Sequence, residues 1–123
     1  MARPIRAVTS DAAAPGALRS GCPVANALDL VGDRWTLLVV RDLLRGKKRF
    51  GELAASSERI PTNILAERLK RLERAGLVEA RPYSAHPPRF EYNLTPAGRE
   101  LEPVLSAVAA WGHARFPTTR APS

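Results

Sequence analysis

The sequence is poor in the residues on which catalysis and metal binding most often depend. Its 123 residues include one cysteine, Cys22, and two histidines, His86 and His113, which lie far apart along the chain. It has no glycine-rich phosphate loop and no Cys, His, Asp and Glu cluster with the spacing of metal ligands. We therefore expect a protein that is not an enzyme and that needs neither a cofactor nor a metal ion.

Disulfides and long apolar runs are also missing. A single cysteine excludes an intramolecular disulfide, which fits a reducing cytosol. No apolar run is long enough to cross a bilayer, and the first twenty residues lack the continuous apolar stretch of a signal peptide. Hydrophobic residues make up 45% of the chain and charged residues 25%, as in an ordinary globular protein. The sequence thus predicts a cytoplasmic protein of one domain with no membrane partner.

Acidic residues are scarce relative to basic ones, and the excess positive charge is concentrated in one segment. The formal net charge is +7. Residues 45–89 contain eleven Lys or Arg and five Asp or Glu, and this excess of six is nearly all of the net charge. A basic cluster attracts polyanions such as nucleic acid, whereas a solvated face kept basic for solubility is the plain alternative. Charge alone leaves both interpretations open.

Helix signals begin after an N-terminal segment of biased composition. Residues 1–20 are rich in Ala, Pro, Arg and Ser and are predicted to form a disordered tail. Pro23 is favoured at a first helical position and Gly32 at a helix end, so a first helix is expected between them. Asp33 is predicted to cap a second helix over residues 34–45.

Two more helices are predicted in the basic segment. Phe50, Leu53 and Ala54 share one face of a short third helix, and a turn at residues 56–59 follows it. The fourth helix is expected over residues 61–75. Its buried stripe consists of three leucines, Leu65, Leu69 and Leu72.

The pattern of the chain then changes from helical to alternating. Residues 77–83 and 89–95 are predicted as the strands of a hairpin, joined by a stiff loop at residues 84–88. A short helix, a turn and a longer helix followed by a hairpin are typical of a helix-turn-helix with a wing.

A last helix is predicted at the C-terminal end. Thr95 is expected to cap a helix over residues 97–116, which Pro103 should bend or weaken because it lacks a backbone N–H. Residues 117–123 are expected to fray. The predicted fold is mainly α with a small β-hairpin, a winged helix-turn-helix domain over residues 21–116.

The fourth predicted helix presents a polar outer face that suits the major groove of DNA, which admits one α-helix. Asn63 is suited to adenine, Lys70 to guanine or a phosphate, and Glu67 to the amino group of cytosine. The residues predicted to form this recognition surface are Thr62, Asn63, Ala66, Glu67, Lys70, Arg71 and Arg74.

Contacts with the DNA backbone are expected from basic residues around this helix. The basic connector before the third helix lies where phosphates can be held, and the stiff hairpin can place Arg89 in the minor groove. Arg68 lies at the edge of the buried stripe, where it either holds the helix in place or touches a phosphate. The predicted backbone and wing contacts are Lys47, Lys48, Arg49, Arg68, His86 and Arg89.

Each of these features has a simpler explanation when taken alone, because basic amphipathic helices and hairpins are usually ordinary surface elements. Their order and joint basicity favour double-stranded DNA as the partner. The alternative is a winged-helix module that binds protein or RNA without an operator. The chain has two Trp, two Tyr and three Phe, most on apolar stripes, which counts against stacking on single-stranded RNA.

The last predicted helix offers more apolar surface than a small domain readily covers alone. Packing on its own core only is the alternative to a homodimer, the usual symmetric solution, which would pair two recognition helices. The residues predicted to form the dimer contact are Val24, Leu28, Leu101, Leu105, Val108 and Trp111.

Seven stretches in the same order resemble the HxlR-type family of winged helix-turn-helix regulators, relatives of the MarR group. They are CPVANALD (22–29), GDRWTLL (32–38), RFGEL (49–53), IPTNILAERL (60–69), LERAGLV (72–78), PPRFEYNLT (87–95), and PVL (103–105) with AWG (110–112). The resemblance implies a homodimer through the first and last helices, with the fourth helix in the major groove. It also implies a repressor or activator at a pseudo-palindromic operator. The segment before Cys22 is longer than the corresponding segment expected for the family.

Cys22 is a candidate redox-sensing residue. It lies at the start of the first helix, where free N–H groups and the helix dipole stabilise a thiolate. The position resembles the one at which some members of the family sense oxidants or electrophiles, which implies an oxidant or small-molecule effector. The alternative is a small buried hydrophobic residue without a redox role.

Overall fold

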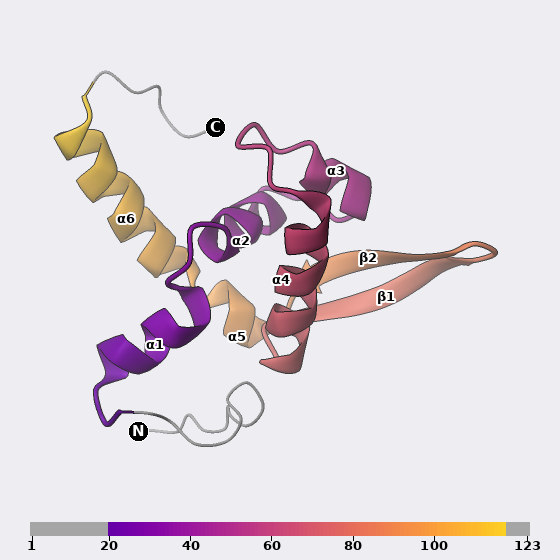
Figure 1. The fold of residues 1–123 in the computed structure, drawn as a ribbon, viewed down its shortest axis with the longest axis horizontal. Coiled ribbons are helices and arrows are strands. Elements are labelled where there is room, and N and C mark those ends of the chain that lie inside the picture. Colours follow the sequence, from indigo (N-terminus) through magenta and orange to yellow (C-terminus); the bar gives the residue numbers. More distant parts are fainter. Residues whose placement is uncertain (1–19, 118–123) are drawn as a thin grey trace.

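The computed structural model describes residues 20–117, which form six helices and one hairpin (Figure 1). The predicted tails, residues 1–20 and 117–123, lie almost entirely outside the described residues. The elements are α1 (Pro23–Val31), α2 (Thr36–Leu44), α3 (Phe50–Ala54), α4 (Thr62–Arg74), β1 (Val78–Ala85), β2 (Pro88–Leu94), α5 (Pro96–Arg99) and α6 (Glu102–Arg115). A mainly helical fold with a two-stranded wing is therefore confirmed.

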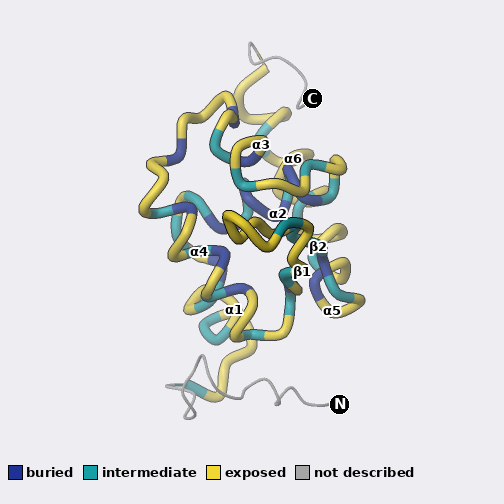
Figure 2. Tube along the Cα trace, turned by 90° about the vertical axis from the view of Figure 1, so that its right-hand side faces the viewer, coloured by how far each residue is buried: buried dark blue, intermediate teal, exposed yellow. Residues whose placement is uncertain are grey.

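The core lies where α2, α3, α4 and the base of the hairpin meet (Figure 2). Leu65, Leu69 and Leu72 of α4 are almost completely buried, as the helical spacing predicted. They pack in one cluster with Val39, Val40, Leu43, Leu53, Ile60, Val78 and Leu94. Because α4 buries this stripe, its opposite face is turned to solvent.

Asp33 accepts backbone N–H groups at the start of α2, but the N-cap residue is Trp35 and not Asp33, because the helix begins later than predicted. The Oδ2 atom of Asp33 accepts the backbone N–H groups of Trp35 at 3.0 Å and Thr36 at 3.1 Å. Residues 34 and 35 form a turn, so α2 starts at Thr36 instead of residue 34. The sequence pattern indicated the residue that binds these N–H groups, but it did not indicate that residues 34 and 35 form a turn before the helix.

The hairpin is longer than predicted. Strand pairing runs from Val78 opposite Leu94 to Ala85 opposite Pro88, with an irregularity between Pro82 and Ser84. The predicted loop of residues 84–88 is therefore reduced to two residues at the tip. Tyr83, between these two residues of β1, has no partner on β2 and shifts the alternation, which made the end of the first strand look like loop. The hairpin projects from the body on the side away from α6 (Figure 1).

The predicted single C-terminal helix is wrong, because the chain forms α5 and α6 with a break between them. Pro103 stands in the first turn of α6. Inside a longer helix its ring would clash with the carbonyl of Arg99, so the first helix ends before it. Thr95 does cap α5, since its Oγ1 accepts the N–H of Gly98 at 3.1 Å and also donates to the Gly76 carbonyl at 2.6 Å.

Candidate nucleic-acid interface

The outer face of α4 is exposed as predicted and lies next to the wing. Six of the seven predicted recognition residues are exposed, and they are Thr62, Asn63, Ala66, Glu67, Lys70 and Arg74. Ala66, Lys70 and Glu73 border a cleft of about 280 Å³ whose other wall consists of hairpin residues, Ala80, Phe90 and Tyr92. One flank of the helix and the wing therefore belong to one surface.

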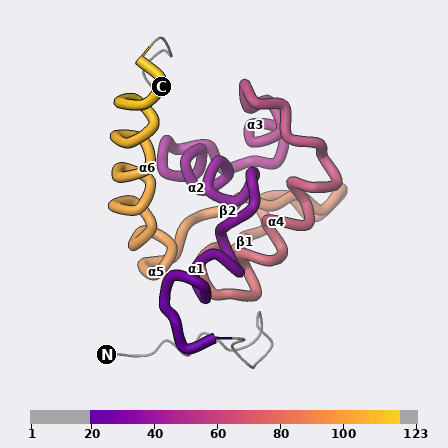
Figure 3. Tube along the Cα trace, turned by 60° about the vertical axis from the view of Figure 1, so that its left-hand side comes forward, coloured from indigo at the N-terminus to yellow at the C-terminus, as the bar shows by residue number. Residues whose placement is uncertain are grey.

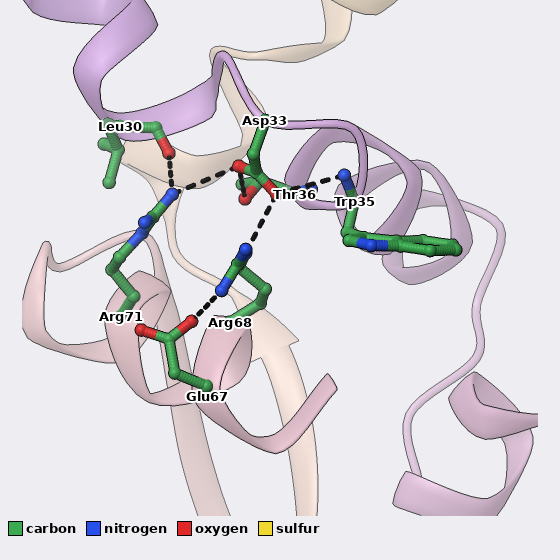
Figure 4. A network of polar contacts seen from close by, with 7 residues as sticks. All are labelled: Leu30, Asp33, Trp35, Thr36, Glu67, Arg68 and Arg71. Carbon is green, nitrogen blue, oxygen red and sulfur yellow. Dashed lines mark hydrogen bonds and ion pairs between the residues drawn. The ribbon is translucent and has the colours of Figure 1, made fainter. Parts of the chain in front are cut away.

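Arg71 is the exception, because its guanidinium turns inward (Figure 4). Its Nη2 donates to the carbonyl of Leu30 at 2.8 Å and to Oδ1 of Asp33 at 3.1 Å. Helical spacing places the Cα of a residue but not the end of a long flexible side chain, so this inward course was not predictable from periodicity.

Arg68 is held at the same corner. Its Nε donates to Oδ2 of Asp33 at 2.8 Å, and its Nη1 contacts the carboxylate of Glu67. This contact agrees with the role of holding α4 in place, and the phosphate contact stays a prediction. Glu67, predicted to accept from cytosine, is thereby paired with a neighbouring cation in the described structure.

Asp33 is the centre of this network, a role that sequence reasoning missed beyond its predicted function as a cap. Burial by itself raises the pKa of its carboxyl, but hydrogen bonds from Arg68, Thr36 and the Trp35 N–H outweigh burial and hold the pKa well below its ordinary value. Asp33 is therefore ionised at neutral pH. In the sequence, the position of Asp33 between Gly32 and a predicted helix indicated a helix cap and gave no hint of the bonds to α4.

A second network fixes the turn between α3 and α4. Arg41 of α2 donates to Glu58 through Nη2 at 2.6 Å and Nη1 at 3.1 Å, and its Nη2 also donates to Ser56 at 3.2 Å. The hydrogen bond from Arg41 lowers the pKa of Glu58 to about 2, against the opposing effect of burial. The turn of the helix-turn-helix is thus bound to α2, while α4 is bound through Arg68 and Arg71 to the corner before α2.

The basic connector docks the wing on the body. The backbone N–H of Tyr92 donates to the Lys48 carbonyl at 2.8 Å. Arg49 pairs with Glu91 at 3.3 Å, and its guanidinium lies 3.9 Å from the ring centre of Tyr83. Glu52 accepts the N–H groups at Lys48 and Arg49, which lowers its pKa. Arg49 is therefore partly engaged within the protein.

The remaining predicted backbone contacts are exposed or half-buried. Lys48 is exposed and Lys47 is half-buried, and His86 and Arg89 lie at the exposed tip of the hairpin. Within residues 20–117 no ion pair is recorded for the side chains of Lys47, Lys48, Lys70, Arg74 or Arg89. These five cations remain available to an external polyanion.

The residues predicted for a dimer contact divide into two groups. Val24, Leu28, Val108 and Trp111 are between 52% and 65% exposed, whereas Leu101 and Leu105 are half-buried against the core of their own chain. Two further apolar residues are exposed on or after α6, and they are Val104 and Phe116. Figure 3 shows α1 and α6 on the same side of the molecule. The exposed apolar residues of α1 and α6 are candidates for contact with a second copy.

Cys22 lies at the N-cap position of α1 and is exposed. Its backbone N–H donates to the Ser20 hydroxyl at 3.0 Å. The alternative of a buried hydrophobic residue does not hold for this chain by itself. Within the described residues no group of His, Cys, Asp and Glu is arranged to hold a metal ion, and no described helix is long and apolar enough to cross a membrane.

This fold is a winged helix-turn-helix, and comparisons with known proteins name its family. Over residues 30–120 the chain matches the family described as HxlR-like helix-turn-helix. An uncharacterized HTH-type transcriptional regulator of Mycobacterium tuberculosis is 43% identical over 102 residues, which cover 83% of this chain and 64% of that protein. YdeP of Bacillus subtilis, also an uncharacterized HTH-type transcriptional regulator, is 40% identical over 92 residues, covering 75% and 72%. The chain belongs to the HxlR-like helix-turn-helix family.

Solved structures agree with this assignment. The redox regulator HypR in its reduced form has a TM-score of 0.69 at 35% identity, covering 76% of this chain and 92% of HypR. The transcriptional regulator YodB from B. subtilis in its reduced form has a TM-score of 0.65 at 34% identity, covering 80% and 98%. This chain spans slightly less than two thirds of the length of its mycobacterial relative.

Proposed function

We propose that this protein is a transcriptional regulator that binds a pseudo-palindromic DNA operator as a homodimer. The observation that carries the proposal is the surface shared by α4 and the wing, which combines exposed Asn63 and Lys70 with the cations of the connector and the hairpin tip. An α-helix with such side chains fits the major groove, and a flanking wing reaches the adjacent backbone or minor groove. The proposed role is binding, without catalysis, and a regulator of this kind is expected in the cytoplasm with the DNA.

A gel shift tests the proposal with duplexes selected from a random-sequence pool. The protein should bind a selected duplex more tightly than a scrambled one of the same length. Its affinity should fall steeply with salt concentration, because basic side chains displace condensed counterions. Equal affinity for both duplexes, or salt-insensitive binding, would contradict the proposal. Tighter binding to single-stranded RNA of the same sequence would favour the alternative of an RNA-binding module.

The dimer part of the proposal rests on the exposed apolar side chains of α1 and α6. Light scattering at micromolar concentration should give the mass of two chains. Val108→Asp places a charge on this face and should yield monomers, because an unpaired charge in an apolar interface is strongly unfavourable. Ser106→Asp adds the same charge on the opposite side of α6 and should remain dimeric. A monomeric wild type would refute this part.

A response to oxidants is a second candidate function, supported by the exposure of Cys22 at the start of α1 and by the likeness to the redox regulator HypR. With one cysteine per chain, two Cys22 thiols of a dimer can form one disulfide while diamide is reduced to its hydrazine. That bond requires Cα atoms about 4.4–6.8 Å apart across the dimer.

Diamide treatment followed by a gel shift tests this response. Wild-type protein should change its affinity for the selected duplex, and non-reducing electrophoresis should show a linked pair of chains. Cys22→Ser should do neither. The same change in both proteins, or none in either, leaves Cys22 without a sensing role. A mixed disulfide with a small thiol would appear instead as a mass increase on one chain.

A further inference from the structure

The corner between α1 and α2 makes an unusually complete set of contacts with α4 (Figure 4). Oδ2 of Asp33 accepts from Arg68 Nε and from the N–H groups at residues 35 and 36, while Oδ1 accepts from Thr36 Oγ1 and from Arg71 Nη2. A carboxylate has roughly four lone-pair positions, so its acceptor capacity is filled. The Asp33 carboxylate therefore has no free acceptor position for a ligand. Its role is to bind the start of α2 and the two arginines of α4.

Arg68 and Arg71 are held on one flank of α4. They are three residues apart and therefore lie on the same side of the helix. Their side chains are 17% and 27% exposed, and that of Asp33 is 22% exposed, so water competes little for these bonds. Nε of Arg71 is buried without a hydrogen-bond partner. Moving Arg71 outward to a phosphate would break its bonds to Asp33 and to the Leu30 carbonyl and leave Asp33 with one guanidinium.

Arg71 also binds the last turn of α1. The Leu30 carbonyl is among the last four of that helix, which have no partner within it. A guanidinium that bonds both this carbonyl and Asp33 joins three elements: the end of α1, the corner before α2, and α4. Charge-assisted hydrogen bonds are short and directional, so they fix orientation as well as distance.

From this geometry we infer that Asp33, Arg68 and Arg71 are positioning residues that set the orientation of α4 relative to α1, and that the two arginines do not contact DNA. This inference rests on the proposed function. Val24 and Leu28, on the exposed side of α1, belong to the face proposed for the dimer. The link therefore ties each DNA-binding helix to the surface that relates the two subunits, and it keeps the two recognition helices in register with the two half-sites.

Asp33→Asn separates this role from the bonds at the start of α2. The single amide oxygen can take the place of Oδ2 and keep the bonds from residues 35 and 36, because Asn accepts such N–H groups as well as Asp does. The amide NH₂ then faces the Arg71 guanidinium, donor against donor, and that link opens. Arg71→Ala opens the same link from α4 and leaves the bonds at the start of α2 intact, so it carries the test if Asp33→Asn does not fold.

The experiment measures the affinity of each variant for a selected duplex and for a scrambled duplex over a range of salt concentrations. Asp33→Asn and Arg71→Ala should each weaken binding to the selected duplex about two- to thirtyfold, the range of mutations that alter coupling between sites. Affinity for the scrambled duplex and the salt dependence should stay unchanged. The affinity of the double variant for the selected duplex should be no lower than that of whichever single variant binds more weakly. Both substitutions break the same link between Asp33 and Arg71, so their effects should not add.

Direct phosphate contact by the arginines predicts opposite results. Arg71→Ala would then weaken binding to both duplexes equally and reduce the salt slope by about one. Asp33→Asn would strengthen binding to both, since it removes a negative charge and releases the Arg71 guanidinium. Either result overturns the inference, as does an unchanged preference in both variants. Arg99→Ala, which removes an exposed charge from α5, should leave the preference intact.

Two further outcomes distinguish a failure of this inference from a failure of the proposed function on which it rests. If wild-type protein prefers no duplex, the proposed function fails and the inference falls with it. If wild-type protein discriminates and Asp33→Asn discriminates equally well, only the inference fails. Thermal melts of each variant show whether it is folded at the temperature of the assay. A purely stabilising network would lower the melting temperature and leave the preference for the selected duplex unchanged.

Discussion

One flank of α4 and its outer face carry similar basic side chains with different surroundings. On one flank, Arg68 and Arg71 are bound to Asp33 and to the end of α1. On the outer face, Lys70 and Arg74 are exposed, and Lys70 also borders the cleft beside the wing. Four basic residues within seven positions of one helix thus fall into a bound pair and a free pair.

The difference shows that the charge of a segment is not a measure of its contact with DNA. Residues 45–89 have an excess of six positive charges, but Arg68 and Arg71 are already paired within the protein. Only cations without an internal partner can release counterions from DNA. The salt dependence of binding should therefore report the free cations and not the whole basic segment.

The largest effect on stability is expected from a substitution in the buried leucine stripe of α4. Leu69 is 2% exposed in the core, and Leu69→Ala should lower the free energy of unfolding by about 2–5 kcal/mol through lost burial and a cavity. Lys70→Ala, on the adjacent residue, should change it by less than about 0.5 kcal/mol. Urea unfolding at equal protein concentrations measures both, since dimer formation makes stability concentration-dependent. Similar losses would mean that α4 is rotated from the orientation described.

The next effect concerns the outer face. Asn63→Ala should cost about 1–3 kcal/mol at the selected duplex and relax the choice of base at one position in each half-site. Arg89→Ala, at the wing tip, should weaken binding to selected and scrambled duplexes alike. Competition gel shifts with single-base variants of the duplex distinguish the two. Retained base preference in Asn63→Ala would show that another residue of α4 faces the bases.

A smaller effect compares the bound and free cations directly. Arg68→Ala should lower the free energy of unfolding by about 1–2 kcal/mol, because it removes a largely buried partner of an ionised carboxylate. Arg74→Ala removes the same charge from the exposed side of the helix and should stay within about 0.5 kcal/mol of wild type. Equal losses in urea unfolding would contradict the division of α4 into a bound and a free pair.

The smallest effect is expected in acid. The folded-state pKa of Glu58 is about 2, below its ordinary value of 4.5, so its contribution is complete above about pH 4.5 and is lost as the pH falls toward 2. The lowered pKa of Asp33 acts in the same direction. Glu58→Gln should therefore show a smaller loss of unfolding free energy between pH 5 and pH 2.5 than wild type. An identical loss in both would show that the Arg41 contact does not persist in solution.

Periodicity and punctuation predicted most of the fold. The leucine stripe of α4, the binding of N–H groups by Asp33 and the wing follow from short-range rules. Gly46 and Gly76 have φ angles of 99° and 78° at the two predicted helix ends, where a side chain would be strained. Pro103 was recognised as a disturbance, but whether it bends a helix or separates two depends on packing, and here Leu101 and Leu105 fix the break against the core.

The candidate site was less predictable, because its long-range partners leave no local pattern. The outer face of α4 follows from helical spacing alone. The pairing of Arg71 with Leu30, 41 positions away, does not, and neither does that of Arg41 with Glu58 across the turn. The one hint of these contacts in the sequence is a basic residue at the border of the buried stripe. That hint suggested a holding role for Arg68 but not for Arg71.

Hydroxyl-radical footprinting on a selected duplex tests the central claim most directly, that α4 recognises DNA as part of a symmetric pair. Two protected segments should appear with their centres about 34–36 Å apart along the duplex, one helical turn, and the complex should contain two protein chains. One protected segment bound by one chain would contradict the dimer. Uniform protection of every sequence would contradict operator recognition itself.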